Sequence, residues 1–327
     1  MNRISGARFL VTGGAGFVGS TIVDQLLDAG ASEVRILDNF VRGTWNNVSS
    51  AIETGRAKVI AGDIRDAALV DRCCDGVDYV FHEAALRITQ CADIPRDAVD
   101  VLIGGMINVL EASVRHGIKK IVAASSASVY GEPSYLPIDE AHPFNNRTIY
   151  GAGKIATEQL LRAYYTSSGM DYAAFRYFNV YGPRMDTVGV YTEVMIRWLH
   201  AIEASQPPLI FGTGEQSMDF VYVGDVAMAN LLAIESDATD EVFNVGTGVQ
   251  TSLRELCDLM LKLSNSSLKP EYREARKVGN VQARRAAVEK AQKMLGFTSQ
   301  VALEDGLREL IRWKQVIKAD PVTVGAL

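Results

Sequence analysis

The chain has 327 residues, and its hydrophobic content of 48 % is enough to bury a large core in more than one lobe. Its net charge of −6 provides no basic face for nucleic acid. No apolar run reaches the roughly 18 residues of a membrane span. The N-terminal sequence shows no secretory segment, so we expect a cytoplasmic protein without a membrane or nucleic-acid partner. The four cysteines and four histidines lack metal-ligand spacing and predict no metal site.

Residues 9–20, FLVTGGAGFVGS, predict a strand, a glycine-rich turn and a helix. Gly13, Gly16 and Gly19 have G-x-x-G-x-x-G spacing, which brings backbone N–H groups and a helix N-terminus against a pyrophosphate. A second predicted strand, 34–37, ends at Asp38, whose carboxylate can accept hydrogen bonds from both adenosine ribose hydroxyls. An acid at this point repels a 2′-phosphate, so it favours NAD over NADP, although Arg42 follows shortly after.

Strands and helices then alternate along the chain. We predict further strands at 58–61, 79–82, 120–124 and 172–178, helices at 66–74, 97–116 and 150–168, and loops at 39–50 and 125–131. This alternation is typical of an α/β protein with a Rossmann-like, doubly wound parallel sheet. Ligands of such sheets lie at the carboxyl ends of the strands, so we expect the site there.

Beyond residue 179 the chain breaks into short pieces at prolines and glycines. We expect strands at 220–223 and 242–245 to return to the main sheet, and helices at 253–263 and 303–314. The expected domains are an NAD-binding domain over 1–178 with returns at 219–246, and a smaller, mostly C-terminal α/β substrate lobe over 179–318. Residues 319–327 are expected to form a tail.

Tyr150 and Lys154 lie four residues apart at the start of a predicted helix, so their side chains leave the same face. The spacing alone is a weak signal, and a surface pair is the alternative. A free tyrosine titrates near pH ~10, and a nearby ammonium with a positive nicotinamide would stabilise its phenolate. Ser126 can share a hydrogen bond to the same substrate oxygen. Together they predict a device that removes a proton from an alcohol while a hydride leaves to NAD⁺.

The chain resembles the NAD-dependent nucleotide-sugar epimerase/dehydratase family of extended short-chain dehydrogenases/reductases. The matching segments, in family order, are VTGGAGFVGS, LDN, GDIRD, HEAA, SSASVYGE, YGAGK, RYFNVYGPR, FGTGEQSMDFVYVGDVA and EARKVGN. The resemblance implies an NAD site made of Gly13, Gly16, Phe17, Val18, Gly19, Asp38, Asn39, Asp63, Ile64, Ala84, Ala85, Tyr150, Lys154, Tyr177 and Phe178. It also implies substrate contacts from Ser126 and Asn179.

The residues before V-Y-G distinguish the chemistries within this family. Dehydratases carry acids at the positions of Ala127 and Ser128, and decarboxylating members carry a glutamate at Ser128. The segment here resembles the 4-epimerases, which implies a UDP-glucose/UDP-galactose type reaction, or its N-acetylhexosamine or hexuronate analogue, through a transient 4-keto intermediate. The alternatives are another nucleotide-sugar oxidoreductase or dehydratase of the family, or a non-catalytic NAD-binding regulator.

Several residues depart from the family pattern. Met218 stands where an arginine usually grips the substrate diphosphate, which makes Arg276 or Lys277 the candidate cation. Leu102 stands where an asparagine usually lies near the cofactor. We expect the Arg284–Arg285 pair to face solvent.

Two predicted helices, 97–116 and 150–168, carry more apolar residues than one sheet face needs. The family uses these helices to form a homodimer, so the resemblance implies the same assembly here. His82 is expected to cap a strand end beside the cofactor rather than to act as a base.

Overall fold

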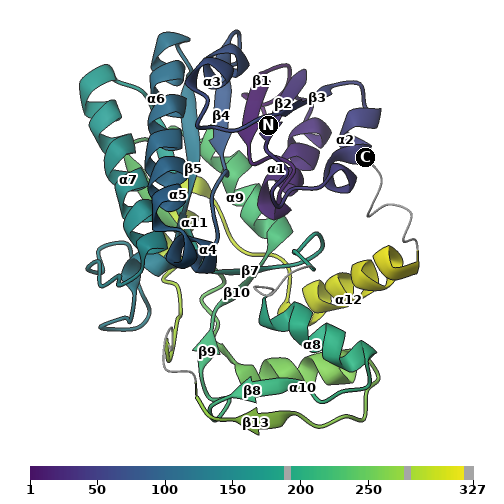
Figure 1. Ribbon diagram of the computed structural model, residues 1–327. Helices are drawn as coiled ribbons and strands as arrows, with labels where there is room; N and C mark the ends of the chain where they lie inside the picture. Colours follow the sequence, from purple (N-terminus) through teal and green to yellow (C-terminus); the bar gives the residue numbers. More distant parts are fainter. Residues whose placement is uncertain (188–192, 276–280, 320–327) are drawn as a thin grey trace.

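The computed structural model describes residues 1–187, 193–275 and 281–319. Its centre is a seven-stranded sheet with the order β11-β6-β5-β4-β1-β2-β3, and every neighbouring pair is parallel (Figure 1). The strands are β1 (Arg8–Thr12), β2 (Glu33–Asp38), β3 (Ala57–Ala61), β4 (Tyr79–His82), β5 (Lys120–Ser126), β6 (Tyr172–Tyr177) and β11 (Glu241–Val245). The predicted Rossmann-like α/β fold is confirmed.

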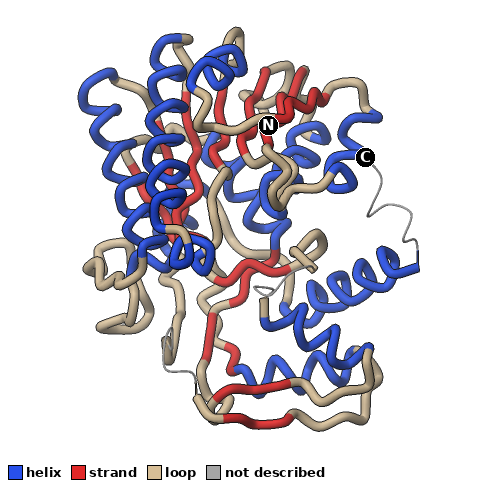
Figure 2. Tube along the Cα trace, in the orientation of Figure 1, coloured by secondary structure: helices blue, strands red, loops and turns tan. Residues whose placement is uncertain are grey.

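Helices cover both faces of this sheet because alternate strand residues are apolar on each side. Phe9 and Val11 of β1 pack in one core with α1 (Phe17–Asp28), α9 (Val223–Glu235) and α11 (Glu289–Leu295). Leu10 packs in the opposite core with α3 (Ala67–Cys74), α6 (Met106–Arg115) and α7 (Ile149–Ser168). Figure 2 shows the strands between the two helical layers.

A smaller lobe lies below the carboxyl ends of the strands in Figure 1. Its own core joins α8 (Val194–Glu203), α10 (Leu253–Leu263) and α12 (Leu303–Ala319). Three two-stranded sheets support it: β7 (Asn179–Tyr181) with β10 (Phe220–Tyr222), β9 (Ser217–Met218) with β12 (Thr251–Ser252), and β8 (Leu209–Phe211) with β13 (Glu271–Arg273). The lobe is therefore a separate packing unit, attached at the carboxyl ends of the strands of the main sheet.

One predicted strand does not join the main sheet. Val242–Val245 belongs to β11, as expected, but β10 pairs with β7 instead. Both edges of β6 are occupied, by β5 and β11, and β10 pairs instead with β7, the short strand that follows β6 in the chain. The expectation of two returning strands was therefore wrong for β10.

Other boundaries differ locally. The predicted helix 97–116 is divided into α5 (Pro95–Val99), a π-helical turn η2 (Asp100–Gly105) and α6. Gly105 lies at the end of the turn, where an added Cβ would come within 2.4 Å of Ile64 Cδ1. Strand β5 continues to Ser126, and the expected loop after it contains the 3-10 turn η3 (Ala127–Tyr130). Additional helices are α2 (Ser49–Glu53) and α4 (Ile88–Asp93), with the 3-10 turn η1 (Trp45–Val48) between β2 and α2.

The described residues contain no helix both long enough and apolar enough to cross a membrane. Nor do they contain a group of three or more histidine, cysteine or acidic side chains that could hold a metal ion. All four cysteines are buried and unpaired.

A buried ion pair ties α7 to the sheet. Arg176 of β6 donates from Nη2 and Nε to the two oxygens of Glu158, at 2.7 and 2.9 Å. Ser125 donates to the same carboxylate, and Tyr130 Oη accepts from Arg176 at 2.9 Å. The two charged side chains are only 4 % and 2 % exposed, so each depends on the other for compensation.

We expect Glu158→Ala to reduce the free energy of unfolding by about 3–5 kcal/mol, because it leaves the Arg176 charge buried and unpaired. A urea titration measures the change. The double variant Glu158→Met/Arg176→Met is the matched control and should recover more than half of the loss. A double variant as unstable as the single one would show that the lost charge compensation is not the cause.

Candidate active site

A cavity of about 2010 Å³ opens at the carboxyl ends of the strands, where the smaller lobe meets the sheet. The predicted site residues that the structure describes all line it: Gly13, Gly16, Phe17, Val18, Gly19, Asp38, Asn39, Asp63, Ile64, Ala84, Ala85, Ser126, Tyr150, Lys154, Tyr177 and Asn179. The candidate cations Arg276 and Lys277 lie outside the described residues. The fold thus gathers at one edge side chains that are far apart in the sequence.

The glycine turn fits a pyrophosphate. Gly13 has a positive φ of 69°, and an added Cβ would lie 2.7 Å from the backbone N of Ala84. An added Cβ at Gly19 would lie 2.3 Å from Gly13 O. Helix α1 begins after Gly16 without a side-chain cap and without an acid in its first turn. Its N-terminal N–H groups and positive dipole end therefore suit an anion at this point of the cavity.

Asp38 sits at the end of β2 and is 7 % exposed. Its two carboxylate oxygens accept from the backbone N–H groups of Ala15 and Phe40, at 2.9 and 2.8 Å. Burial raises the pKa of this carboxyl, and these backbone hydrogen bonds lower it. These hydrogen bonds hold the side chain in one orientation, and each oxygen keeps a further lone pair that a ribose hydroxyl could use.

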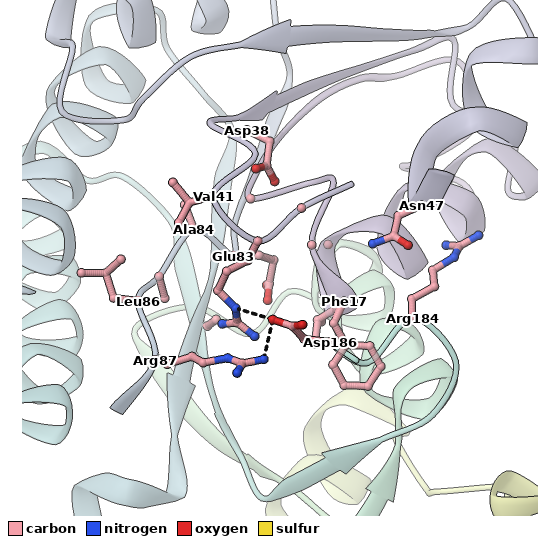
Figure 3. A pocket seen from close by; sticks show the side chains of 18 of the residues that line it. Phe17, Asp38, Val41, Asn47, Glu83, Ala84, Leu86, Arg87, Arg184 and Asp186 are labelled. Carbon is pink, nitrogen blue, oxygen red and sulfur yellow. Dashed lines mark hydrogen bonds and ion pairs between the residues drawn. The ribbon is translucent and has the colours of Figure 1, made fainter. Parts of the chain in front are cut away.

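Arg42, the cation near Asp38 that could attract a 2′-phosphate, lies beside a second carboxylate. Its Nε lies 3.6 Å from Asp186 Oδ2, and Arg87 Nη2 donates to the same oxygen at 2.7 Å (Figure 3). Asp186 follows β7 in the smaller lobe, so the two arginines join that lobe to the loops after β2 and β4. An acid beside Arg42 weakens its attraction for an extra phosphate, which supports the preference for NAD.

Asp63 is held by two neighbours at the other end of the cavity. Arg65 donates to both of its oxygens, at 3.0 and 2.9 Å, and Asn39 Nδ2 donates at 2.9 Å. The Arg65 hydrogen bond is the main cause that lowers the pKa of Asp63 to about 2. Its carboxylate is therefore an ionised acceptor beside the predicted adenine position.

The predicted catalytic residues converge where β5 ends and α7 begins. Lys154 is 3 % exposed, its Nζ donates to Ala124 O at 2.7 Å, and it lies 5.8 Å from the centre of the Tyr150 ring. Burial raises the pKa of Tyr150 to about 12, and a hydrogen bond with the Ser126 side chain lowers it. Burial lowers the pKa of Lys154. A hydroxyl, a phenol and an ammonium thus share one wall of the cavity.

The sequence profile of the NAD dependent epimerase/dehydratase family matches residues 9–246. This chain belongs to that family. A putative UDP-glucose 4-epimerase of Methanocaldococcus jannaschii is 39 % identical over 307 residues, which cover 93 % of this chain and 97 % of the relative.

Two solved structures resemble this epimerase/dehydratase over nearly its whole length. A UDP-N-acetylglucosamine 4-epimerase of Methanobrevibacter ruminantium, in complex with UDP-N-acetylmuramic acid, has a TM-score of 0.91 and 33 % identity, covering 95 % of this chain and 99 % of that one. A UDP-glucose 4-epimerase of Thermotoga maritima with UDP-glucose has a TM-score of 0.89 and 33 % identity, with the same coverage.

The sequence-based prediction missed a carboxyl group in this epimerase/dehydratase site. Glu83 follows β4, lines the cavity and accepts from Tyr177 Oη at 3.0 Å; Figure 3 shows its side chain pointing into the cavity. Tyr177 is also within hydrogen-bond distance of Asn230 Nδ2, at 2.8 Å. Burial raises the pKa of Glu83, and Tyr177 and Lys154 lower it. Only the HEAA motif marked this position, and it did not reveal the side-chain environment.

The structure accounts for Leu102 and Met218, which depart from the family pattern, and for the state of His82. Leu102 is 2 % exposed and packs with Tyr150 and Cys91 under the start of α7. Met218 packs against the core of the smaller lobe and is not among the cavity-lining residues. His82 Nδ1 lies 2.8 Å from Thr12 Oγ1, and burial lowers its pKa to about 3, so it is neutral and is no base at physiological pH.

The expectation that Arg284 and Arg285 face solvent was wrong. Both side chains are only partly exposed, and Arg284 lines the cavity. The reason is that residues 281–287 pair with the backbone at Ser217 and Ile138 instead of forming a surface turn. Charge density in the sequence does not reveal such a pairing.

We expect the free energy of unfolding of Glu83→Gln to rise relative to that of the wild type as the pH increases. The raised pKa of Glu83 means that its native carboxyl is stable when protonated, and that stability is lost as the pH rises through the raised pKa. Glutamine has no such loss. Free energies of unfolding at pH 5 and pH 8 measure the effect, and Glu111→Gln on the exposed side of α6 is the control. An equal difference at both pH values would contradict the prediction.

Proposed function

We propose that this chain is an NAD-dependent nucleotide-sugar 4-epimerase that works through a transient 4-keto intermediate. The observation that carries the proposal is the convergence of Ser126, Tyr150 and Lys154 on one wall of a cavity whose opposite end has the glycine turn and Asp38. The relatives that bind UDP-glucose or a UDP-N-acetyl sugar support a UDP-linked substrate. The remaining site residues are proposed in the roles that the sequence predicts.

In this proposal Tyr150 removes the proton from the C4 hydroxyl, and Ser126 donates a hydrogen bond to the same oxygen. Lys154 stabilises the phenolate by its charge and hydrogen-bonds the nicotinamide ribose. The glycine turn and Asp38 would hold NAD, which would supply the hydride chemistry: oxidation at C4 of the sugar and return of the hydride on the opposite face. Tyr177 and Phe178 line the cavity beside Tyr150 and are proposed to hold the nicotinamide end, with Asn179 at the substrate phosphates.

The residues of this site support dehydration of the sugar less well than epimerisation. Elimination of water needs a general acid near the sugar, and the turn after Ser126 carries Ala127 and Ser128 instead. The carboxyl of Glu83 also lines the cavity, but it accepts a hydrogen bond from Tyr177 and has none from the turn after β5 among the described residues. Epimerisation requires only the alcohol-oxidising groups that the cavity brings together.

We expect Tyr150→Phe to reduce turnover of a UDP-hexose by about 10²–10⁴-fold, because it removes the proton acceptor. NMR of the C4 epimers measures turnover. NAD should stay bound, since the rest of its predicted site is unchanged, and it is quantified after release by denaturation. Tyr164→Phe, on the same helix outside the cavity, is the control. Full activity of Tyr150→Phe would eliminate the mechanism, and net consumption of NADH by the wild type would favour a reductase.

We also propose that residues 1–178 bind NAD with help from 219–246 and that 179–318 bind the sugar nucleotide. Of the expected tail 319–327, Ala319 is the last residue of α12 and residues 320–327 lie outside the described residues. The four unpaired thiols support a reducing cytoplasm as the compartment. A homodimer through the helices near 97–116 and 150–168 is proposed, because Val99 and Val114 on this side are 50 % and 41 % exposed.

The dimer predicts a change of mass. Val99→Glu/Val114→Glu should convert a dimer to a monomer in sedimentation velocity, because it places charges in an apolar contact. Val249→Glu, at a residue 62 % exposed in the loop between β11 and β12, should leave the dimer intact. A wild-type monomer, or a double variant that stays dimeric, would contradict this interface.

A further inference from the structure

Arg284 is held in place by backbone pairing on two sides. Its N–H donates to Ser217 O at 2.9 Å, and the next residue accepts from Ile138 N at 2.7 Å. Ala286 N donates to the buried carboxylate of Asp219 at 3.1 Å. In an extended segment successive side chains point to opposite sides. Accordingly, Arg284 is among the residues that line the cavity and Arg285 is not.

The charge of one acid, Glu132, acts on the Arg284 guanidinium, but from beyond ion-pair distance. Within the described ranges no carboxylate forms an ion pair with it, and its Nε is buried without a hydrogen-bond partner. Its Nη2 donates to Gly131 O, but this hydrogen bond is long at 3.5 Å. By contrast, Arg184, which also lines the cavity, lies 2.7 Å from Asp24 Oδ2. A half-buried charge without a counter-charge is costly, so a ligand is the natural source of the missing anion.

A second unpartnered group lies on the neighbouring turn. Ser128 Oγ is buried without a hydrogen-bond partner and lines the same cavity. Its turn, η3, lies between Ser126 and Gly131. The carbonyl of Gly131 accepts the long hydrogen bond from Arg284. One polar atom without a partner therefore lies on the turn after Ser126, and another belongs to the arginine that contacts the end of this turn.

The sheet order separates this anion site from the dinucleotide pyrophosphate. Asn244 of β11 donates to Ile138 O at 2.8 Å, so the segment that carries Arg284 lies near β11. The glycine turn follows β1, which is four strands away in the sheet. At about 4.8 Å per strand the two positions are roughly 19 Å apart. The same cavity thus has two anion sites, and only the one at the glycine turn suits the cofactor.

We propose that Arg284, assisted by Ser128, binds an anionic group of the substrate: a carboxylate on the sugar, or the substrate's own diphosphate. The proposal rests on the proposed function, because it assigns the anion to a nucleotide sugar. A neutral hydroxyl or acetamido group could accept a hydrogen bond from the guanidinium but would not neutralise its charge.

Calorimetric titration of the NAD-loaded protein distinguishes the two sources. The probes are UDP, UDP-glucose and UDP-glucuronic acid, and the variant is Arg284→Gln. If the group is a sugar carboxylate, only UDP-glucuronic acid should bind about 10- to 100-fold more weakly, while UDP and UDP-glucose change less than twofold. If it is the diphosphate, all three should weaken by a similar factor. Unchanged affinity for all three would overturn the proposal.

Arg285→Gln is the matched control and should bind all three probes like the wild type. The NAD content of each variant should be unchanged, because the glycine turn is remote from residue 284. If Arg284→Gln does not fold or loses NAD, Arg284→Lys replaces it and should weaken the same probes by a smaller factor, since lysine keeps the charge but not the paired donors. Wild-type affinity in that variant would overturn the proposal. A wild type that binds no probe would overturn the proposed function as well, whereas selective loss in the variant supports both.

Discussion

The position of helix α7 against strand β5 is the constraint on which the catalytic centre depends. Tyr150, Lys154 and Glu158 are four residues apart, so they form one line along the helix. Lys154 Nζ bonds Ala124 O at 2.7 Å, and Glu158 accepts from Ser125. Tyr150 is hydrogen-bonded with the side chain of the next strand residue, Ser126. Consecutive residues of one strand thus meet successive turns of one helix, and the phenol cannot move without disturbing an ammonium and a buried ion pair.

The same burial that fixes these groups makes the unliganded site a poor base. Desolvation raises the pKa of Tyr150, lowers that of Lys154 and raises that of Glu83. Each shift disfavours a charge, and an ionised Glu83 would further oppose the phenolate. A positive ligand at the nicotinamide end changes this balance, because it favours both anions at once. In the proposed mechanism, proton removal by Tyr150 would therefore be coupled to cofactor occupancy through electrostatics.

Much of the main sheet could be predicted from the sequence, because its strands are short buried runs that end in glycine or polar residues. Strand β4 and helix α10 begin and end as expected. The glycine spacing likewise identified the turn after β1. The pairing of β10 could not be predicted, because its sequence does not show that both edges of β6 are occupied. Helix α9 was missed because it is apolar on nearly all sides, so its buried residues show little helical periodicity.

The candidate site divides in the same way. Tyr150, Lys154 and Asp38 carry local signals, since spacing or a strand end marks them. Glu83 is marked only by the HEAA motif and Arg284 by no motif, and the environment of both side chains comes from residues distant in the chain. Glu83 meets Tyr177 across 94 residues. Sequence patterns can therefore locate residues with local signals, while the surroundings of Glu83 and Arg284 follow only from tertiary contacts.

The buried carboxylate of Asp219 shows how such a distinguishing position can be supported. It accepts from Thr247 N and Oγ1, Gly248 N and Ala286 N, at 2.7–3.1 Å. These hydrogen bonds join three segments of the chain: the end of β9, the turn after β11 and the strand-like piece that carries Arg284. The carboxylate is fully buried, and its oxygens accept hydrogen bonds from backbone N–H groups and one hydroxyl. Its role is therefore to fix the relative position of these segments. The side chain at residue 284 can then vary in charge and size while its backbone stays in place. Under the proposed role of Arg284, the substrate-anion contact would therefore have a support of its own, formed by Asp219, while Lys154 and Glu158 of α7 are held by residues of β5 and β6.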